Sequence, residues 1–148
     1  MSRNTSVSLI TLWVNRLVCL LVVAMLPTFP IFLKWYVGFR PLTEVSQGVL
    51  TVAFYICAVI TLLALWNVDK LLRCILNEEV FTEKNVSTIR TIRWCCAIIS
   101  LVCLPAAFFY LPLIFMVLIM AFLALVITVL VRVMSAAVEI REENDLTI

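Results

Sequence analysis

The sequence contains no histidine, only two glycines and few charged residues. Charged side chains make up 14% of its 148 residues, and the formal net charge is +2. The lack of histidine removes the commonest general base, and Gly38 and Gly48 are too few for a glycine-rich phosphate loop. The small net charge excludes a nucleic-acid-binding domain of the usual basic kind. These absences argue against an enzyme and against direct contact with nucleic acid.

Apolar residues, by contrast, are abundant. They make up 65% of the chain, against roughly 45–50% in a soluble domain, and the mean hydropathy is +1.18. A globule of this length has too little interior to bury so much apolar surface. The apolar stretches do not alternate with a period of two, which excludes a membrane β-barrel and leaves membrane-spanning helices.

Three stretches lack Asp, Glu, Lys and Arg: residues 17–33, 45–68 and 94–131. A helix needs about 20 residues to cross a hydrocarbon core of roughly 30 Å, so the third stretch is long enough for two spans. Its reversal is expected near residues 105–112, because proline removes a helix donor and disfavours helix before it. We therefore predict one all-α membrane domain over residues 1–148, a four-helix bundle. Its spans lie at about 13–36, 48–68, 94–109 and 112–131, with a polar loop at 69–93 and a tail at 132–148.

Local features refine the expected helix ends. Pro27 and Pro30 should kink the first span, and the second helix should continue to about residue 76. The spacing of Asp69 and Arg73 allows an ion pair on one helix face. Thr82 is expected to cap the third helix, and the fourth should continue past its span to about residue 143.

Lysine and arginine are distributed unevenly along the chain. Nine flank the amino terminus, the loop at 69–93 and the tail, whereas only Lys34 and Arg40 flank the other two connections. The positive-inside rule then places both termini and the central loop in the cytoplasm. We predict an N-in, C-in orientation in a bacterial cytoplasmic membrane, with the lipid bilayer as the surrounding partner.

Reactive and polar side chains within the spans are few. None of the six cysteines shows C-x-x-C spacing, so we interpret them as small packing residues, while a redox or acylation role for Cys74, Cys95 or Cys96 stays open. No ionisable residue lies inside the four apolar cores, which argues against an ion pathway. We expect Ser100 to bond a carbonyl of its own helix, and no cofactor or metal is predicted. The other mild polar groups are expected to hold helices together: Thr28, Thr51, Tyr55, Thr61 and Thr128.

Two polar segments contain recognisable motifs. Residues 80–86 read Val-Phe-Thr-Glu-Lys-Asn-Val and are followed by Ile89-Arg90, and residues 142–148 read Glu-Glu-Asn-Asp-Leu-Thr-Ile. In these motifs the chain resembles a bacterial family of small four-helix membrane proteins, domain-of-unknown-function family twenty-nine seventy-five. The resemblance implies no particular activity. Members of that family frequently accompany a small helix-turn-helix regulator of the Xre/Cro type, which implies a membrane partner or anchor for such a regulator.

We predict a docking surface for a cytoplasmic partner in the loop and tail. Its residues are Phe81, Asn85, Arg90, Arg93, Glu142, Glu143, Asn144 and Asp145. The first two should shape the loop, the two arginines should orient it at the membrane, and the four tail residues should face the partner. An acidic tail suits a regulator, whose DNA-binding surface is basic. A solvated acidic tail, with or without folding back onto the two arginines, is the alternative interpretation of the same charges.

Two other functions stay open. One is an immunity or stress-protection protein that works through its bundle core or its outer surface, for which residues 34–47 and 105–112 should matter. The other is a small transporter or a transporter subunit. The sequence also leaves open whether the chain forms a homo-oligomer.

Overall fold

The computed structural model describes residues 2–39, 41–77 and 82–147, with side chains from residue 9 onwards. These residues form four helices: α1 (Ser2–Phe39), α2 (Glu44–Leu76), α3 (Glu83–Phe109) and α4 (Leu113–Leu146). Each helix is long and apolar enough to cross a bilayer. This confirms the predicted all-α fold with four helices able to span a membrane.

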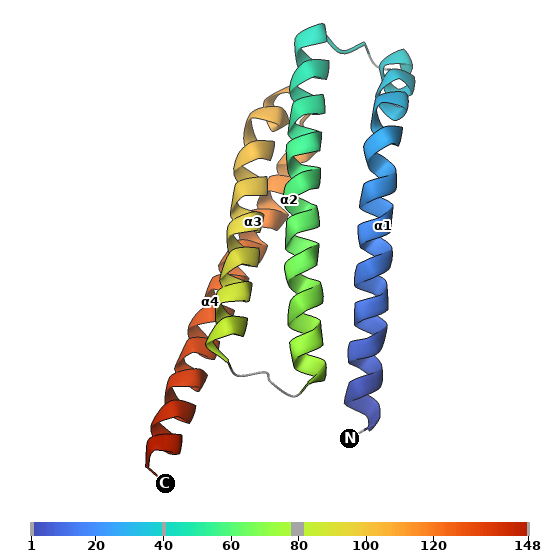
Figure 1. The fold of residues 1–148 in the computed structure, drawn as a ribbon. Helices are drawn as coiled ribbons and strands as arrows, with labels where there is room; N and C mark the ends of the chain where they lie inside the picture. Colours follow the sequence, from blue (N-terminus) through green and yellow to red (C-terminus); the bar gives the residue numbers. More distant parts are fainter. Residues whose placement is uncertain (1, 40, 78–81, 148) are drawn as a thin grey trace.

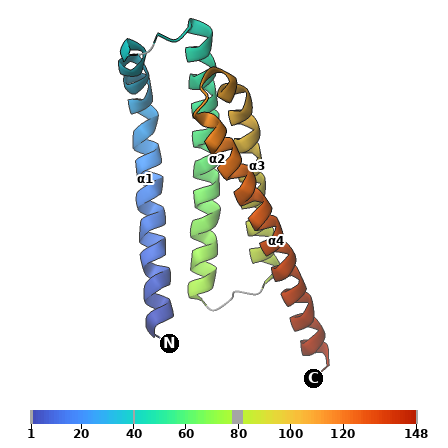
Figure 2. The same cartoon turned by 180° about the vertical axis from the view of Figure 1, so that it is seen from behind.

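The helices alternate in direction (Figures 1 and 2). Four helix ends therefore lie together: the amino ends of α1 and α3 and the carboxyl ends of α2 and α4. We call this the terminal end of the molecule and the other the opposite end. Neighbours in sequence pack side by side, α1 on α2, α2 on α3 and α3 on α4. Among the described residues, the backbone of α1 approaches only α2. The bundle is therefore an open row rather than a closed ring of helices.

The end of α2 and the reversal between α3 and α4 agree with the sequence. α2 ends at Leu76 as predicted, and the chain reverses at residues 110–112, inside the predicted segment. Pro105 lies inside α3 without ending it. Thr82 holds the N-cap position with an extended backbone, yet its side chain makes no capping bond. Its carbonyl instead accepts the amides of Asn85 and Val86, at 3.0 and 3.2 Å.

The prolines of α1 change how this helix bonds to its neighbour. Pro27 and Pro30 both lie inside α1, and beyond them the last turns bend away from the axis of the helix (Figures 1 and 2). Pro30 has no N–H, so the carbonyl of Leu26 loses its usual donor four residues along. The hydroxyl of Tyr55 in α2 donates to that carbonyl at 3.2 Å. A backbone group freed by proline thus gains a partner from the next helix, as an apolar environment requires.

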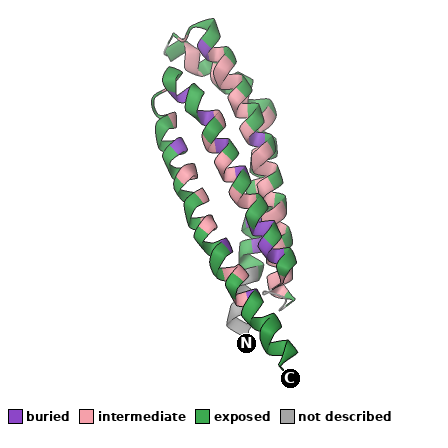
Figure 3. Cartoon of the chain, turned by 90° about the vertical axis from the view of Figure 1, so that its left-hand side faces the viewer, coloured by how far each residue is buried: buried purple, intermediate pink, exposed green. Residues whose placement is uncertain are grey.

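Most buried side chains belong to α3, which lies between α2 and α4 (Figure 3). Near the terminal end, Val86 and Ile89 pack against Val131 and Val138 of α4; we call this the terminal cluster. Nearer the opposite end, a second group, the membrane cluster, joins three helices. It consists of Ile99, Cys103 and Val117, with Cys57, Ile60 and Met120 packed against it. The two clusters make α3 the common wall of the bundle.

The polar groups within the helices bond differently from the sequence expectation. Ser100 donates to the carbonyl of Val117 in α4 at 3.2 Å, so the predicted bond within its own helix is wrong. Ser100 lies on the face of α3 that packs against α4, and a helical carbonyl has a second lone pair to accept it. Conversely, Thr28, Thr51 and Thr128 donate to carbonyls four residues earlier in their own helices and do not join helices.

Candidate functional site

The first turns of α3 and the last turns of α4 enclose a groove of about 400 Å³ at the terminal end. Its lining is Glu83, Val86, Ser87, Arg90, Ser135, Val138, Glu139 and Glu142. Three carboxylates thus share the groove with one guanidinium, above an apolar floor that belongs to the terminal cluster. We call it the acidic groove. It unites Arg90 and Glu142, two of the residues predicted for docking.

Asn85, in contrast, lies inside the protein. Only 1% of its surface is exposed, the lowest value among the described polar residues. It neighbours Val86 of the terminal cluster and stands in the first turn of α3. A buried amide of this kind suits the predicted role of shaping the loop and leaves direct contact with a partner to exposed residues.

Arg93 lines a different groove from Arg90. Its guanidinium lies over the ring of Trp94, 5.4 Å from the centroid, and the pair lines a second groove between α3 and α4. That groove includes small residues, among them Ser100, Ala121 and Ala124. Arg93 is therefore separated from the acidic groove, and stacking on Trp94 holds its charge beside the apolar stretch.

The tail continues α4 as helix to Leu146 and does not fold back. Glu143, Asn144 and Asp145 are exposed on its last turns (Figure 3). Within residues 9–39, 41–77 and 82–147, no ion pair joins the tail to Arg90 or Arg93. This part of the tail therefore does not fold back onto the two arginines, and a solvated acidic tail stays open as the alternative interpretation. Phe81, the remaining predicted docking residue, lies outside the described residues.

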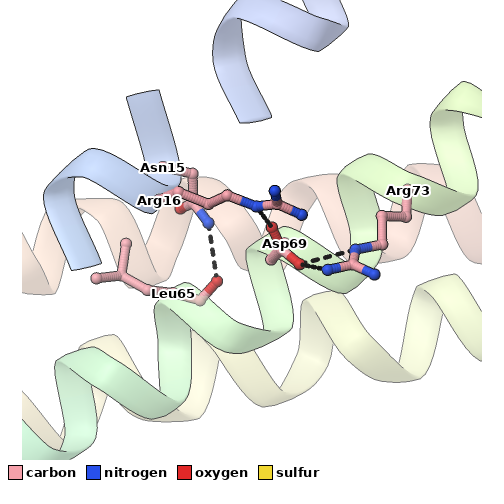
Figure 4. A network of polar contacts seen from close by, with 5 residues as sticks. All are labelled: Asn15, Arg16, Leu65, Asp69 and Arg73. Carbon is pink, nitrogen blue, oxygen red and sulfur yellow. Dashed lines mark hydrogen bonds and ion pairs between the residues drawn. The ribbon is translucent and has the colours of Figure 1, made fainter. Parts of the chain in front are cut away.

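A second polar site joins α1 to α2 near the terminal end (Figure 4). Arg73 binds Asp69 through its Nε and Nη2 atoms, at 2.9 and 2.8 Å, which confirms the predicted pair. Arg16 of α1 approaches the other carboxylate oxygen at 3.5 Å, and the Asn15 amide donates to the Leu65 carbonyl at 3.1 Å. We call these five residues the Asp69 cluster. Sequence analysis missed the contribution of α1, for which the polar pair Asn15-Arg16 beside a long apolar run was the available signal.

At the opposite end, an apolar cavity of about 270 Å³ opens between the helices. All four helices contribute to its wall, including Phe29, Tyr36, Phe54 and Tyr110. Cys57 and Cys103 also line it, with their sulfur atoms 3.6 Å apart. The thiols meet at a packed interface between α2 and α3. Among the described residues, no three Cys, Asp or Glu side chains are grouped so that they could hold a metal ion.

These features define the class of protein: an all-α chain with four helices able to span a membrane, whose charged side chains are concentrated at one end. The family model described as "Protein of unknown function (DUF2975)" matches residues 9–148. The chain therefore belongs to this family, which is the family twenty-nine seventy-five that its motifs resemble. No curated protein and no solved structure matches the chain.

Proposed function

We propose that this chain is a non-enzymatic protein of the bacterial cytoplasmic membrane, and that its α2–α3 loop and acidic tail bind a cytoplasmic protein. A helix-turn-helix transcriptional regulator is the partner whose chemistry fits best. The observation that carries the proposal is the last part of α4, an exposed helical extension that projects past the ends of α2 and α3 (Figures 1 and 2).

The charge of this extension supports a basic partner. Residues 139–147 contain four acids and one arginine, and every one of them is exposed. The acidic groove adds Glu83 from α3 to the same side. Complementary charge speeds encounter with a basic protein and aligns it.

Apolar side chains on the same extension add a second kind of contact. Ile140 and Leu146 are 65% and 87% exposed, although they stand among charged residues. An amphipathic helix that leaves apolar groups open is a common surface for binding a partner protein. The extension therefore offers both charge and apolar contact to one partner.

The test is co-purification of the regulator with the membrane protein. A short helix-turn-helix reading frame beside this gene is the partner to express with it. Deletion of residues 142–148, and the full-length variant E142Q/E143Q/D145N, should both release the regulator. The matched control is Glu44→Gln, which removes an exposed acid at the opposite end. Binding of the unaltered chain should also weaken with added salt, because the Debye length is about 8 Å at 0.15 M ionic strength. Regulator recovery that is unchanged after the deletion would overturn the proposal.

A second candidate function is immunity or stress protection through the bundle core, and the apolar cavity favours it. If that function holds, Ala53→Leu, which adds volume at the cavity wall, should abolish protection of cells. Deletion of residues 142–148 should then have no effect. The two functions thus predict opposite outcomes for the deletion of residues 142–148.

A further inference from the structure

The Asp69 cluster places two arginines from different helices on one carboxylate (Figure 4). Arg73 uses Nε and Nη2 on Oδ2 of Asp69, and Arg16 directs its Nε toward Oδ1. Both guanidinium side chains remain more than half exposed, at 51% for Arg16 and 61% for Arg73. A single carboxylate thus keeps two exposed guanidinium groups side by side.

The cluster has more positive than negative charge. Two arginines face one aspartate, and the exposed Lys70 follows directly in α2. Within the described part of the chain, Nη1 and Nη2 of Arg16 and Nη1 of Arg73 have no protein acceptor. These N–H groups are therefore available to an anion, and paired guanidinium groups match the oxygens of a phosphate.

The position of the cluster along the helices defines which anion reaches it. Arg16 directly precedes the charge-free stretch 17–33 of α1, and Asp69 directly follows the charge-free stretch 45–68 of α2. The cluster therefore lies at the terminal-end limit of both charge-free stretches, at the level expected for lipid headgroups. Trp13 and Trp66, three residues before Arg16 and Asp69 respectively, are 70% and 76% exposed, as expected for indole rings at a membrane interface.

We propose that the Asp69 cluster binds the headgroup phosphate of an anionic phospholipid. Arg16 and Arg73 bind the phosphate oxygens, and Lys70 adds positive charge. Asp69 is a positioning residue, because it holds both guanidinium groups in place and does not itself touch the lipid. Basic sites between helices at the membrane surface are suited to such headgroups. The proposal is independent of the protein partner and of which leaflet the terminal end faces.

The first experiment compares lipids bound to the full chain. The protein is reconstituted in vesicles of equal parts phosphatidylglycerol and phosphatidylcholine, and the retained lipids are counted by native mass spectrometry. The unaltered chain should retain phosphatidylglycerol preferentially. The variant R16Q/R73Q should lose this preference by about tenfold or more, because it removes both guanidinium groups and the charge-assisted hydrogen bonds that they donate to the phosphate. The control R132Q/R141Q removes two exposed arginines of α4 and should keep it. Equal preference in all three proteins would overturn the proposal.

Two further variants separate a formed site from general attraction. Asp69→Asn makes the chain more positive, so general attraction predicts tighter binding of phosphatidylglycerol, whereas loss of the positioning carboxylate predicts weaker binding. Weaker binding is our expectation, and tighter binding would contradict the site. R16K/R73K keeps both charges and their attraction to Asp69, which protects the fold, and should retain part of the preference that R16Q/R73Q loses. Equal loss of the phosphatidylglycerol preference in R16Q/R73Q and R16K/R73K would also contradict the site.

The last arm distinguishes the headgroup from a soluble anion. The chain is placed in phosphatidylcholine vesicles, and inorganic phosphate is added while thermal unfolding is followed. We expect phosphatidylglycerol in the vesicles to raise the melting temperature of the unaltered chain more than millimolar phosphate does. For R16Q/R73Q we expect the lipid and the phosphate to have equal effects. Stabilisation by phosphate equal to that by the lipid would assign the site to a soluble anion and overturn the lipid assignment.

Discussion

The α1–α2 interface and the α3–α4 interface are built from different contacts. α1 is joined to α2 by separate interactions spaced along the helices: the Asn15–Leu65 bond, the Arg16–Asp69 pair, and the Tyr55–Leu26 bond. Near the last of these, the rings of Phe29 and Phe54 stack at 3.8 Å. α3 instead packs on α4 through buried apolar side chains, from the terminal cluster through to Val117 of the membrane cluster.

The physical reason for this difference is the surroundings of each interface. Inside hydrocarbon, burying one apolar side chain against another gains no hydrophobic free energy, so helices associate through packing and hydrogen bonds. The terminal cluster lies largely outside the charge-free stretch 94–131, because Val86 and Ile89 precede it and Val138 follows it. Water borders this part of α3 and α4, so the hydrophobic effect stabilises their packing there. α1 has no comparable packing outside the membrane among the described residues and depends on polar and aromatic contacts.

The largest expected effect compares two isoleucines of α3 that are both 4% exposed, Ile89 and Ile99. Ile89→Ala should lower the free energy of unfolding by about 2–5 kcal/mol, because it removes a buried side chain and leaves a cavity. Ile99→Ala should cost less by about 2 kcal/mol. Ile99→Ala removes three carbon atoms, and each would contribute about 0.8 kcal/mol if the side chain left water on folding. Ile99 faces lipid rather than water when the helices separate, so this contribution is absent. Reversible unfolding in mixed micelles measures both.

Two exposed isoleucines of α4 serve as controls for this pair. Ile140, 65% exposed beyond the apolar stretch, and Ile119, 55% exposed within it, should each tolerate alanine with little change in stability. If Ile89→Ala and Ile99→Ala cost the same, the distinction between water-bordered and lipid-bordered packing is wrong.

A smaller effect is expected where proline frees a backbone carbonyl in α1. Tyr55→Phe removes the donor to the Leu26 carbonyl and should lower stability by about 0.6–1.7 kcal/mol, which runs from the mean to the maximum for hydrogen bonds between membrane helices. Pro30→Ala restores an N–H four residues after Leu26. In the Pro30→Ala background, Tyr55→Phe should therefore have almost no effect. A double-mutant cycle with no coupling between the two positions would show that the tyrosine does not compensate for the proline.

The smallest effect tests a hydrogen bond between α3 and α4. Ser100→Ala removes the bond to the Val117 carbonyl and should cost about 0.6 kcal/mol, the mean for such bonds. Thr128→Ala is the control, because Thr128 donates within its own helix. If Ser100→Ala lowered the free energy of unfolding more than Tyr55→Phe does, the contrast between the two interfaces would be wrong. The α3–α4 interface would then depend on polar bonds more than the α1–α2 interface does.

Sequence patterns predicted the parts of the candidate sites that depend on local spacing. The Asp69–Arg73 pair follows from positions four apart on one helix, and the position of Thr82 before α3 follows from the preference of threonine for the N-cap. The same reasoning failed for Ser100. A serine bonds within its own helix or to a neighbouring helix according to the side of the helix on which it lies. That reasoning also grouped Arg93 with Arg90, although the two side chains line different grooves that follow one another along the α3–α4 interface.

The sequence by itself determined the number of helices able to span a membrane, where they end and the all-α class. These follow from the length of each charge-free stretch relative to the bilayer, which is a property of one segment at a time. Only the tertiary structure decided that Arg16 meets Asp69, that Tyr55 meets Leu26, and that Glu142 shares a groove with Arg90. Such meetings depend on the order and rotation of neighbouring helices, and these are set by how the side chains of different helices pack together.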